Sequence, residues 1–276
     1  MDWNKTKTIF IGVFLVLNIF LAVMFFNKYS ASPYEVIKKT SIEQKLQQDG
    51  VQYEAMPDDT GEHSTIVTKP RTFTEKDLLF LTKQKGAIQN DDTEIVSVLE
   101  KPYETDGAAR SKLNSFVKNN VLHGGEYAYW KRNREANTVI YYQKIEGKKL
   151  FENGSGMLTV QLNDEEEITG YSQTMLSNIN GNLDEQTILP ALEAIDSLYK
   201  NGLIQLDSEI SNAELGYYTV VQWDEEPEAQ IGQINESEIK QVLSPTWYFQ
   251  LKKGDQTEEV YVNAFNGSIN SPQKES

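Results

Sequence analysis

The chain has 276 residues, of which 39% are hydrophobic and 24% charged, so it is long and apolar enough for one large domain or two ordinary ones. Its formal net charge is −15, and a surface this acidic repels phosphate backbones, which argues against a nucleic-acid partner. Cysteine is absent, which excludes disulfides, thiolate nucleophiles and cysteine-bound metals.

The first predicted element is an apolar helix close to the N-terminus. Residues 9–26 carry no charge and span about 27 Å as a helix, close to the ~30 Å hydrocarbon core of a bilayer. The run is longer than the roughly 7–15 apolar residues of a signal peptide, and Lys28 and Tyr29 follow it where a small-residue cleavage site would stand. The sequence therefore predicts an uncleaved transmembrane helix over residues 9–28, after a cytoplasmic head of residues 1–8.

The orientation of this helix is predicted from the lengths of the two segments that flank it rather than from their charges. Lysines flank the span on both sides, so the numbers of positive charges before and after it are nearly equal. A very short head before a large body is typical of a signal-anchor, in which the head stays inside and the body is exported. We therefore expect a single-pass protein of the cell membrane with a cytoplasmic N-terminus and an extracytoplasmic body.

Asn18 is the one clearly polar residue of the apolar run, and it has two interpretations. A strongly apolar span tolerates a single amide. Alternatively, the amide bonds to a neighbouring transmembrane helix, which is worth about 0.6–2 kcal/mol. Ala22 lies one turn further along the same face, where a small residue permits close approach, and Leu15 and Ile11 continue that face. These four residues form the predicted contact with a partner helix.

The body is expected to begin with a linker and a short helix. Residues 29–40 are the predicted linker, and they contain Pro33. Ser41 and Gln44 have the spacing of a capping box at a helix N-terminus, and Gly50 is placed to end that helix.

Two strands and a second helix are predicted next. The strands cover residues 51–55 and 64–68, with a loop rich in turn residues between them. Thr74 is the expected N-cap of a helix that carries an apolar cluster at residues 78–81 and ends at Gly86.

A more regular stretch follows, and it begins with an amphipathic helix over residues 106–122. Leu113, Phe116, Val117 and Val121 recur at i, i+3, i+4 and i+8, which places them in one apolar stripe. Five strands are then predicted, and in the fourth of them Leu158, Val160 and Leu162 alternate with polar residues; the strands cover residues 126–131, 137–145, 149–153, 156–162 and 167–176.

The same order of elements then repeats. Asp184 is the predicted cap of a helix that contains Pro190 in its first two turns and ends at Gly202, and its apolar stripe is Ile188, Leu192, Ile195, Leu198 and Tyr199. Strands are predicted at residues 215–223, 246–254 and 258–265. The fold class is therefore α+β, with a first lobe over residues 41–180, a second over residues 181–271 and a loose tail at 272–276.

No catalytic or metal-binding pattern is found in the sequence. His63 and His123, the only histidines, are interpreted as structural, and Ser155 lacks the G-x-S-x-G context of a nucleophile elbow. Asp59-Thr60-Gly61 occurs once, whereas an aspartic protease needs two carboxylates. The acidic runs at residues 163–167 and 224–228 lack EF-hand spacing and are interpreted as solvated turns. We therefore expect a protein that is not an enzyme and has no cofactor.

Four stretches carry a resemblance to a known family. The opening MDWNKTKTIFIGVFLVLNIFL is the most specific, and it is followed by SIEQKL (residues 41–46) and by PTWYFQLKKG and VYVNAFNGSI near the C-terminus. In these segments the chain resembles the YycI (WalI) family of membrane-anchored accessory proteins from low-GC Gram-positive bacteria. The closing hairpin is shared more widely with YycH and PepSY-like modules.

The resemblance implies both a fold and a function. The family has one transmembrane helix and an extracytoplasmic α+β body similar to the C-terminal domains of YycH. Together with YycH it associates with the sensor kinase WalK (YycG) of an essential two-component system, WalK/WalR (YycG/YycF), that controls cell-wall metabolism. Contact between transmembrane helices is implicated in that association. The family offers no catalytic motif that could be carried over to residues of this chain.

Three functions are therefore compared. The leading hypothesis is a non-enzymatic regulator whose helix packs beside a kinase helix. The second is an extracytoplasmic module that binds a ligand or inhibits a protease, as PepSY-like hairpins suggest. The third, a membrane-anchored hydrolase, lacks a visible nucleophile and base.

Overall fold

The structure is a computed structural model that describes residues 3–31, 41–180, 185–223 and 240–270. The chain forms two compact units, Met1–Lys45 and Leu46–Ser276. The boundary falls inside a short helix, α2 (Ile42–Gln48), at whose start the backbone N–H of Gln44 donates to Ser41 Oγ over 3.3 Å. This hydrogen bond confirms the predicted N-cap. Most of the predicted linker, residues 32–40, lies outside the described residues.

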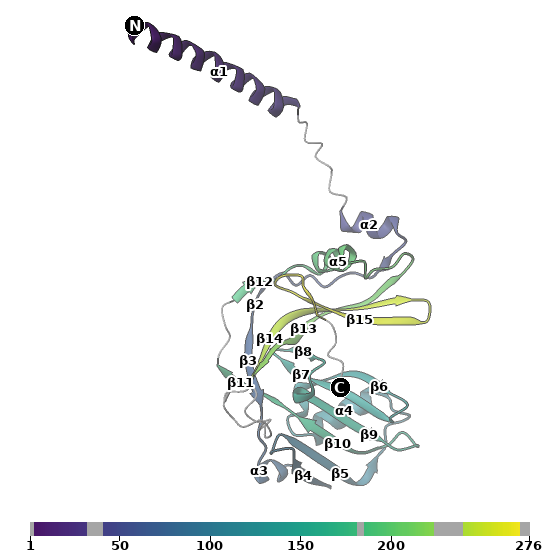
Figure 1. Ribbon diagram of the computed structural model, residues 1–276. Helices are drawn as coiled ribbons and strands as arrows, with labels where there is room; N and C mark the ends of the chain where they lie inside the picture. The colour runs from purple at the N-terminus through teal and green to yellow at the C-terminus, as the bar shows by residue number, and fades with distance from the viewer. Residues whose placement is uncertain (1–2, 32–40, 181–184, 224–239, 271–276) are drawn as a thin grey trace. The chain divides into compact units, whose positions relative to one another are not determined.

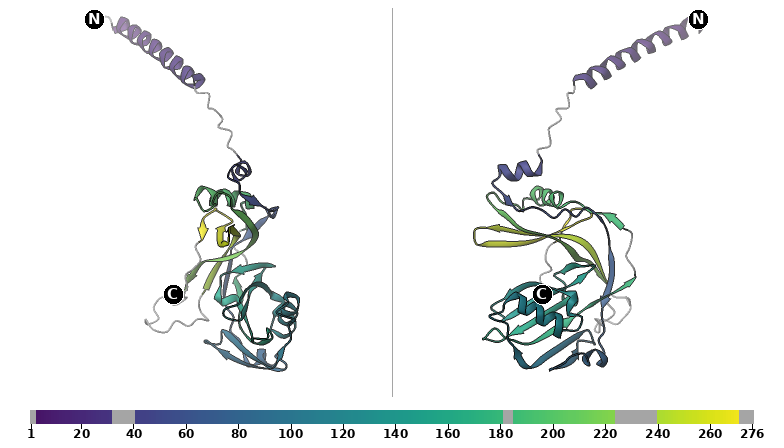
Figure 2. Two further views of the ribbon diagram at one scale, coloured as in Figure 1. Left: turned by 90° about the vertical axis from the view of Figure 1, so that its right-hand side faces the viewer. Right: turned by 180° about the vertical axis from the view of Figure 1, so that it is seen from behind.

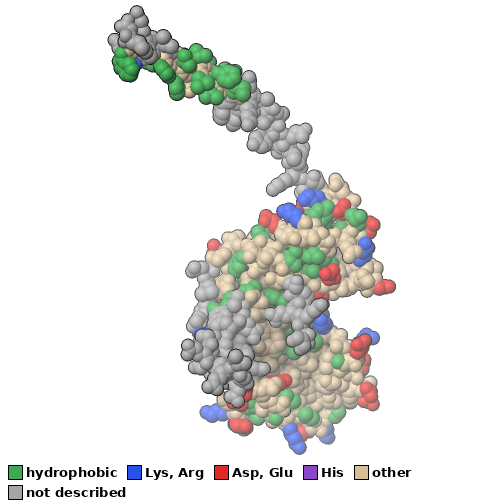
Figure 3. Space-filling model, in the orientation of Figure 1, with side chains coloured by type: hydrophobic (Ala, Val, Ile, Leu, Met, Phe, Trp, Pro, Cys, Tyr) green, Lys and Arg blue, Asp and Glu red, His purple; other side chains and the backbone are tan. Residues whose placement is uncertain are grey.

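The first unit contains the helix α1 (Trp3–Ala31). Its large apolar side chains between Phe10 and Met24 are each 47–67% exposed, and Figure 3 shows apolar side chains along the visible face of the helix. In the described part of the chain, no helix combines the length and the apolar character needed to cross a membrane. The transmembrane helix at residues 9–28 and its orientation therefore stay predictions.

The second unit is a mixed α+β structure made mostly of sheet, with strands in two groups (Figure 1). We call the first group the α4 sheet. It is antiparallel throughout, and its strands in spatial order are β6 (Tyr127–Asn133), β7 (Thr138–Ile145), β9 (Met157–Leu162), β10 (Ile168–Thr174), β5 (Glu94–Tyr103) and β4 (Gln84–Gln89). The helix α4 (Arg110–Asn120) lies across one face of this sheet, as the right-hand view of Figure 2 shows.

The second group, which we call the α5 sheet, lies beside the helix α5 (Ala191–Lys200). Its strands in spatial order are β1 (Gln52–Tyr53), β13 (Glu209–Trp223), β14 (Lys240–Lys253), β15 (Gln256–Asn263) and β16 (Ile269–Asn270). Only the β1–β13 pair is parallel. A separate two-stranded sheet pairs β2 (Glu62–Ser64) with β12 (Glu185–Thr187).

Three further strands continue the sheet from one group to the other. β8 (Lys148–Phe151) pairs antiparallel with β7 and parallel with β13. β3 (Ile66–Pro70) pairs with the start of β14 and with β11 (Leu176–Asn180). Strands on both sides of residue 180 are thus hydrogen-bonded into one sheet, and the predicted two-lobe division at that residue is not confirmed.

The main core of the α4 sheet confirms the predicted helical stripe. Leu113, Phe116, Val117 and Val121 are all buried and belong to one apolar cluster with residues of β7, β9 and β10. That cluster also includes Leu158, Val160 and Leu162, whose alternation along β9 is confirmed. The helix itself is shorter than the predicted 106–122, and a 3-10 turn, η1 (Gly124–Glu126), follows it.

The helix predicted from Thr74 to Gly86 is wrong. Only α3 (Glu75–Leu78) is helical, and Gly86 lies inside β4. A β-carbon on Gly86 would stand 2.6 Å from Leu81 and 2.9 Å from Leu78, so these leucines fold back over the strand. Pairing with β5, a strand that the sequence did not reveal, therefore replaces the helix beyond Leu78.

The predicted start of the second long helix is also wrong. α5 begins at Ala191 with Pro190 as its N-cap, and residues 185–187, which were predicted to be helical, form β12. Proline lacks the backbone N–H that a helix interior needs, so the helix begins after it. Ile188 is buried but not helical, and the predicted cap, Asp184, lies outside the described residues.

Candidate functional site

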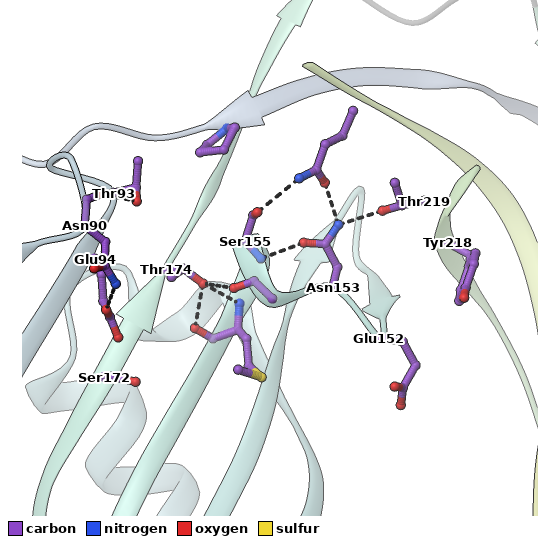
Figure 4. A pocket seen from close by; sticks show the side chains of 14 residues that line it. Asn90, Thr93, Glu94, Glu152, Asn153, Ser155, Ser172, Thr174, Tyr218 and Thr219 are labelled. Carbon is purple, nitrogen blue, oxygen red and sulfur yellow. Dashed lines mark hydrogen bonds between the residues drawn. The ribbon is translucent and has the colours of Figure 1, made fainter. Parts of the chain in front are cut away.

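A polar cleft of about 380 Å³ opens at the junction of the two sheets (Figure 4). Residues from η2 (Gly154–Gly156), the 3-10 turn between β8 and β9, meet the ends of β3 and β10, the turn between β4 and β5, and parts of β13 and β14 there. The lining residues are Pro70, Asn90, Thr93, Glu94, Glu152, Asn153, Gly154, Ser155, Met157, Ser172, Thr174, Tyr218, Thr219 and Gln241.

Asn153 is the centre of a hydrogen-bond network on one wall of this cleft (Figure 4). Its Nδ2 donates to Thr219 Oγ1 and to Gln241 Oε1, both over 2.6 Å, and its Oδ1 accepts from the backbone N–H of Ser155 over 2.8 Å. Gln241 Nε2 in turn donates to Ser155 Oγ over 3.0 Å. Asn153 and Gln241 are 5% and 2% exposed, so the network fixes this wall firmly.

Thr174 fixes the other side of the η2 turn. Its hydroxyl accepts from the backbone N–H of Met157 over 3.0 Å and lies 2.5 Å from the carbonyl oxygen of Gly154. The turn is therefore attached to β10 on one side and to β13 and β14 on the other. Because these groups are bonded within the protein, the wall is organised before any ligand arrives.

Two carboxylates give the cleft its charge. Glu94 accepts from Asn90 Nδ2 over 2.5 Å, and Glu152 accepts from the hydroxyl of Tyr261 over 3.3 Å. Neither carboxylate has an ion-pair partner in the described residues, and the lining contains no lysine or arginine. Burial, with the charge of Glu152 as a further cause, raises the pKa of Tyr261. This arrangement suits a neutral polar ligand or one that carries an amine.

The two histidines and Ser155, which the sequence indicates are not catalytic, lie apart from one another. Ser155 lies in the cleft, but its hydroxyl is bonded to the amide of Gln241. His63 Nε2 lies 3.0 Å from Asp59 Oδ1, and His123 Nδ1 lies 3.4 Å from Glu126. Neither histidine lines the cleft.

The Asp59 and His63 pair is structural in character. Partial burial raises the pKa of Asp59, but the hydrogen bond and charge of His63 outweigh that effect and hold the pKa below its ordinary value of 3.8. Lys148, 3.6 Å away, acts in the same direction. The pair fastens the loop that contains Asp59-Thr60-Gly61 to β2.

The first acidic run, residues 163–167, is a turn bonded to its surroundings. Glu166 pairs with Arg132 over 2.5 Å, and the backbone N–H of Glu167 donates to Asn163 Oδ1 over 2.8 Å. The second run, residues 224–228, lies outside the described residues. Within the residues that are described, no group of three or more histidine, cysteine, aspartate or glutamate side chains could hold a metal ion.

The predicted contact residues lie together on one face of α1. Ile11, Leu15, Asn18 and Ala22, with Phe14 and Ile19, line a shallow depression along that helix. All four are exposed. Because this contact needs a partner chain, it stays a prediction.

Comparison with known proteins places the chain in a family. The model of the YycI protein family matches residues 31–265, which is most of the chain. This chain belongs to the YycI family. The match includes every residue of the polar cleft, whereas the contact residues predicted on α1 precede it.

Comparison with solved structures is less informative. An uncharacterized protein from Eubacterium rectale shares 10% identity at a TM-score of 0.47, with 82% of this chain and 92% of that chain covered. The YpeB C-terminal domain of Bacillus megaterium shares 9% identity at a TM-score of 0.40, covering 83% and 94%. At such TM-scores neither likeness supports a conclusion. No curated protein sequence matches the chain.

The sequence did not reveal the residues that build the cleft. Asn153 is 66 residues from Thr219 and 88 from Gln241, so no local pattern connects them. The available signal was a glutamine directly before the apolar pair Val242 and Leu243, since a buried amide requires a partner.

Proposed function

We propose that this YycI-family chain is a non-enzymatic regulatory protein of the WalK/WalR two-component system that controls cell-wall metabolism. In this proposal it associates with the sensor kinase WalK (YycG) together with YycH. The family match over residues 31–265 carries the proposal, since membership is consistent with a regulatory role in that system.

The proposal includes an anchor in the cell membrane, with the N-terminus in the cytoplasm and the body outside. Its support is the uncharged run of residues 9–26 and the exposure of large apolar side chains on every side of α1. Such exposure in water is costly, at about 25 cal/mol for each Å² of apolar surface. A lipid environment would remove that cost.

The contact with the kinase is proposed to use Asn18, Ala22, Leu15 and Ile11. A partner helix placed against this face would meet the amide of Asn18 and approach closely at Ala22. Contact with one kinase state in preference to another would shift the population of kinase states. A coupling free energy of about 1–3 kcal/mol is sufficient for a regulatory effect.

Replacement of Asn18 and Ala22 by leucine tests this contact. The double variant N18L/A22L keeps the helix apolar but removes the amide and the close approach. We expect co-purification with the kinase to fall by about fivefold to thirtyfold, as the loss of about 1–2 kcal/mol implies, and target-gene output to change with it.

The matched control is the double variant V16L/F20L, which has the same i, i+4 spacing on the opposite face of α1. It should leave both association and output at wild-type levels. Unchanged association in N18L/A22L, measured at equal protein abundance, would rule out the proposed contact.

A second candidate function is an extracytoplasmic module that binds a ligand or inhibits a protease. The polar cleft favours it, because its lining is rich in amides, hydroxyls and carboxylates and one wall is fixed by internal hydrogen bonds (Figure 4). Calorimetry of the fragment from Ser30 onward against soluble wall fragments separates the two functions. Heat of binding supports the module, whereas regulation that is lost when the body is released from its anchor supports the first function.

A further inference from the structure

A second, basic groove of about 390 Å³ lies where α4 and η1 meet β6, β7 and β8. Its lining residues come from α4, η1 and these three strands, and α4 is visible in the right-hand view of Figure 2. We call it the basic groove, and its lining residues are Arg110, Asn114, Val117, Lys118, Gly124, Gly125, Tyr127, Ala128, Tyr129, Tyr141, Lys144 and Lys149. None of them also lines the polar cleft.

The charge of this groove is opposite to that of the whole protein. The chain has 41 acidic and 26 basic residues, yet the lining contains four cations and no carboxylate. Lys149 pairs with Glu214 over 2.7 Å. Arg110, Lys118 and Lys144 have no carboxylate within ion-pair distance among the described residues, although Lys112, on the same helix, does pair with Asp106.

Three cations without counterions at one groove repel one another, and in an acidic protein nearby carboxylates would relieve that repulsion at little cost. Lys144 is also half-buried, so part of its hydration is lost without a compensating ion pair. An anion in the groove would offset both effects.

The other lining groups are suited to holding such an anion. The guanidinium of Arg110 lies over the ring of Tyr129, 4.4 Å from its centroid, which orients the fork of N–H donors. The Tyr141 hydroxyl donates to Asn114 Oδ1 over 3.1 Å, so the side-chain N–H₂ of Asn114 remains to donate to a ligand.

The backbone at Gly124 and Gly125 contributes the end of the groove. A β-carbon on Gly124 would stand 1.8 Å from the carbonyl oxygen of Val117, so glycine is required for η1 to pack against the last turn of α4. A β-carbon on Gly125 would meet nothing within 4 Å, so the space before it is open.

We propose that the basic groove binds a phosphate-bearing ligand. A phosphate group with a charge of about −1.5 to −2 matches three unpaired cations better than a single carboxylate does. Arginine can bind phosphate through two N–H groups, while the lysines act as point charges. This site is independent of α1 and of the kinase contact, so it goes beyond the proposed function.

The test uses the full chain in a neutral detergent, with tripolyphosphate as the probe and calorimetry as the measurement. We expect saturable binding that weakens as salt is added, since the attraction is electrostatic and the net charge of the protein opposes it. In the double variant R110Q/K144Q the affinity should fall at least tenfold, because two charge-assisted contacts are lost.

The matched control is K85Q/K101Q, which removes the same charge from two exposed lysines of β4 and β5 that do not line the groove. Its affinity should stay within about twofold of wild type, the small effect expected of distant exposed charges. Equal losses in the two double variants would show a nonspecific charge effect and overturn the proposal.

A second probe identifies the source of the phosphate. Short-chain phosphatidylglycerol, used below its micelle concentration, carries the phosphate as a lipid headgroup. Binding of this probe alone supports a lipid headgroup, and binding of tripolyphosphate alone, or of both, supports a phosphate site open to soluble ligands. Failure of both probes to bind wild-type protein would overturn the proposal.

Discussion

At the scale of single residues, Asn153 and Gly216 hold the junction between the two sheets by different means. Asn153 connects the end of β8 to β13 and β14 through its side-chain amide. Gly216 contributes by having no side chain, since a β-carbon there would stand 2.4 Å from the carbonyl oxygen of Lys149 and 2.3 Å from the ring of Phe151. β13 can therefore lie against β8 only because residue 216 is glycine.

Gly216→Ala tests this requirement. The new methyl group faces a backbone carbonyl that cannot rotate away, so we expect the free energy of unfolding to fall by about 1–3 kcal/mol, as in other overpacked sites. Chemical denaturation of the fragment from Ser30 onward measures it. Gly125→Ala is the control, because a β-carbon there meets open space, and equal stability of the two variants would contradict the close approach.

At the scale of elements, α3 shows how a strong local signal can define a helix start without defining its length. The backbone N–H and hydroxyl of Thr74 both donate to Asp77 Oδ2, over 2.8 and 2.9 Å, which is the predicted cap. Asp77 also pairs with Arg71 over 2.9 Å. These contacts begin a helix that ends after one turn because the following residues pair with β5.

The charge of Asp77 gives this helix start a pH dependence. Partial burial raises the pKa of Asp77, but hydrogen bonds from Thr74 and the charge of Arg71 outweigh it and hold the pKa below 3.8. A carboxyl group with a lowered pKa in the folded state stabilises the protein above its unfolded pKa. That stabilisation is lost as the pH falls from about 4 through the folded pKa.

Asp77→Asn should therefore reduce the free energy of unfolding by about 1–2 kcal/mol at pH 7 and by progressively less below about pH 4. Denaturation of the variant and the wild type across this pH range measures the difference. Asp106→Asn, which affects an exposed ion pair with Lys112, should have a much smaller effect at every pH. A pH-independent loss in Asp77→Asn would show that the carboxylate charge is unimportant.

At the scale of the whole molecule, β8 and its neighbours join the two sheets into one body. Phe151, fully buried at the end of β8, has its ring centroid 5.5–5.7 Å from those of Tyr248 and Tyr261 in the α5 sheet. It lies 5.6 Å from that of Trp130 in the α4 sheet. The same residue thus packs against both sheets, which favours their unfolding as one unit.

Phe151→Ala should lower the free energy of unfolding by about 3–5 kcal/mol, the usual cost of removing a buried aromatic ring. Because the ring contacts both sheets, we expect the single transition to shift as a whole. Separate fluorescence signals from Trp130 and Trp247, each kept as the only tryptophan, should report the same midpoint. Two separate transitions in wild type would favour the predicted lobes at residues 41–180 and 181–271.

The sequence alone determined the elements whose signal lies within a few neighbouring residues. The stripe of α4 and the alternation along β9 were predicted because helices and strands repeat every 3.6 and 2 residues. The apolar run of α1 and the polar spacing at Ser41 and Gln44 are equally local. Family membership was also predicted from short segments of the sequence, and it is confirmed by the match over residues 31–265.

Only the tertiary structure decided which segments meet. Residues 84–89 became a strand because β5 supplies hydrogen-bond partners for their backbone, a gain that local helix signals cannot include. The polar cleft and the basic groove likewise consist of residues from separate elements. Their side chains can bond to one another, or act on the same ligand, only after folding brings them together. Local sequence fixes periodicity, whereas burial and pairing across the whole sheet select the partners.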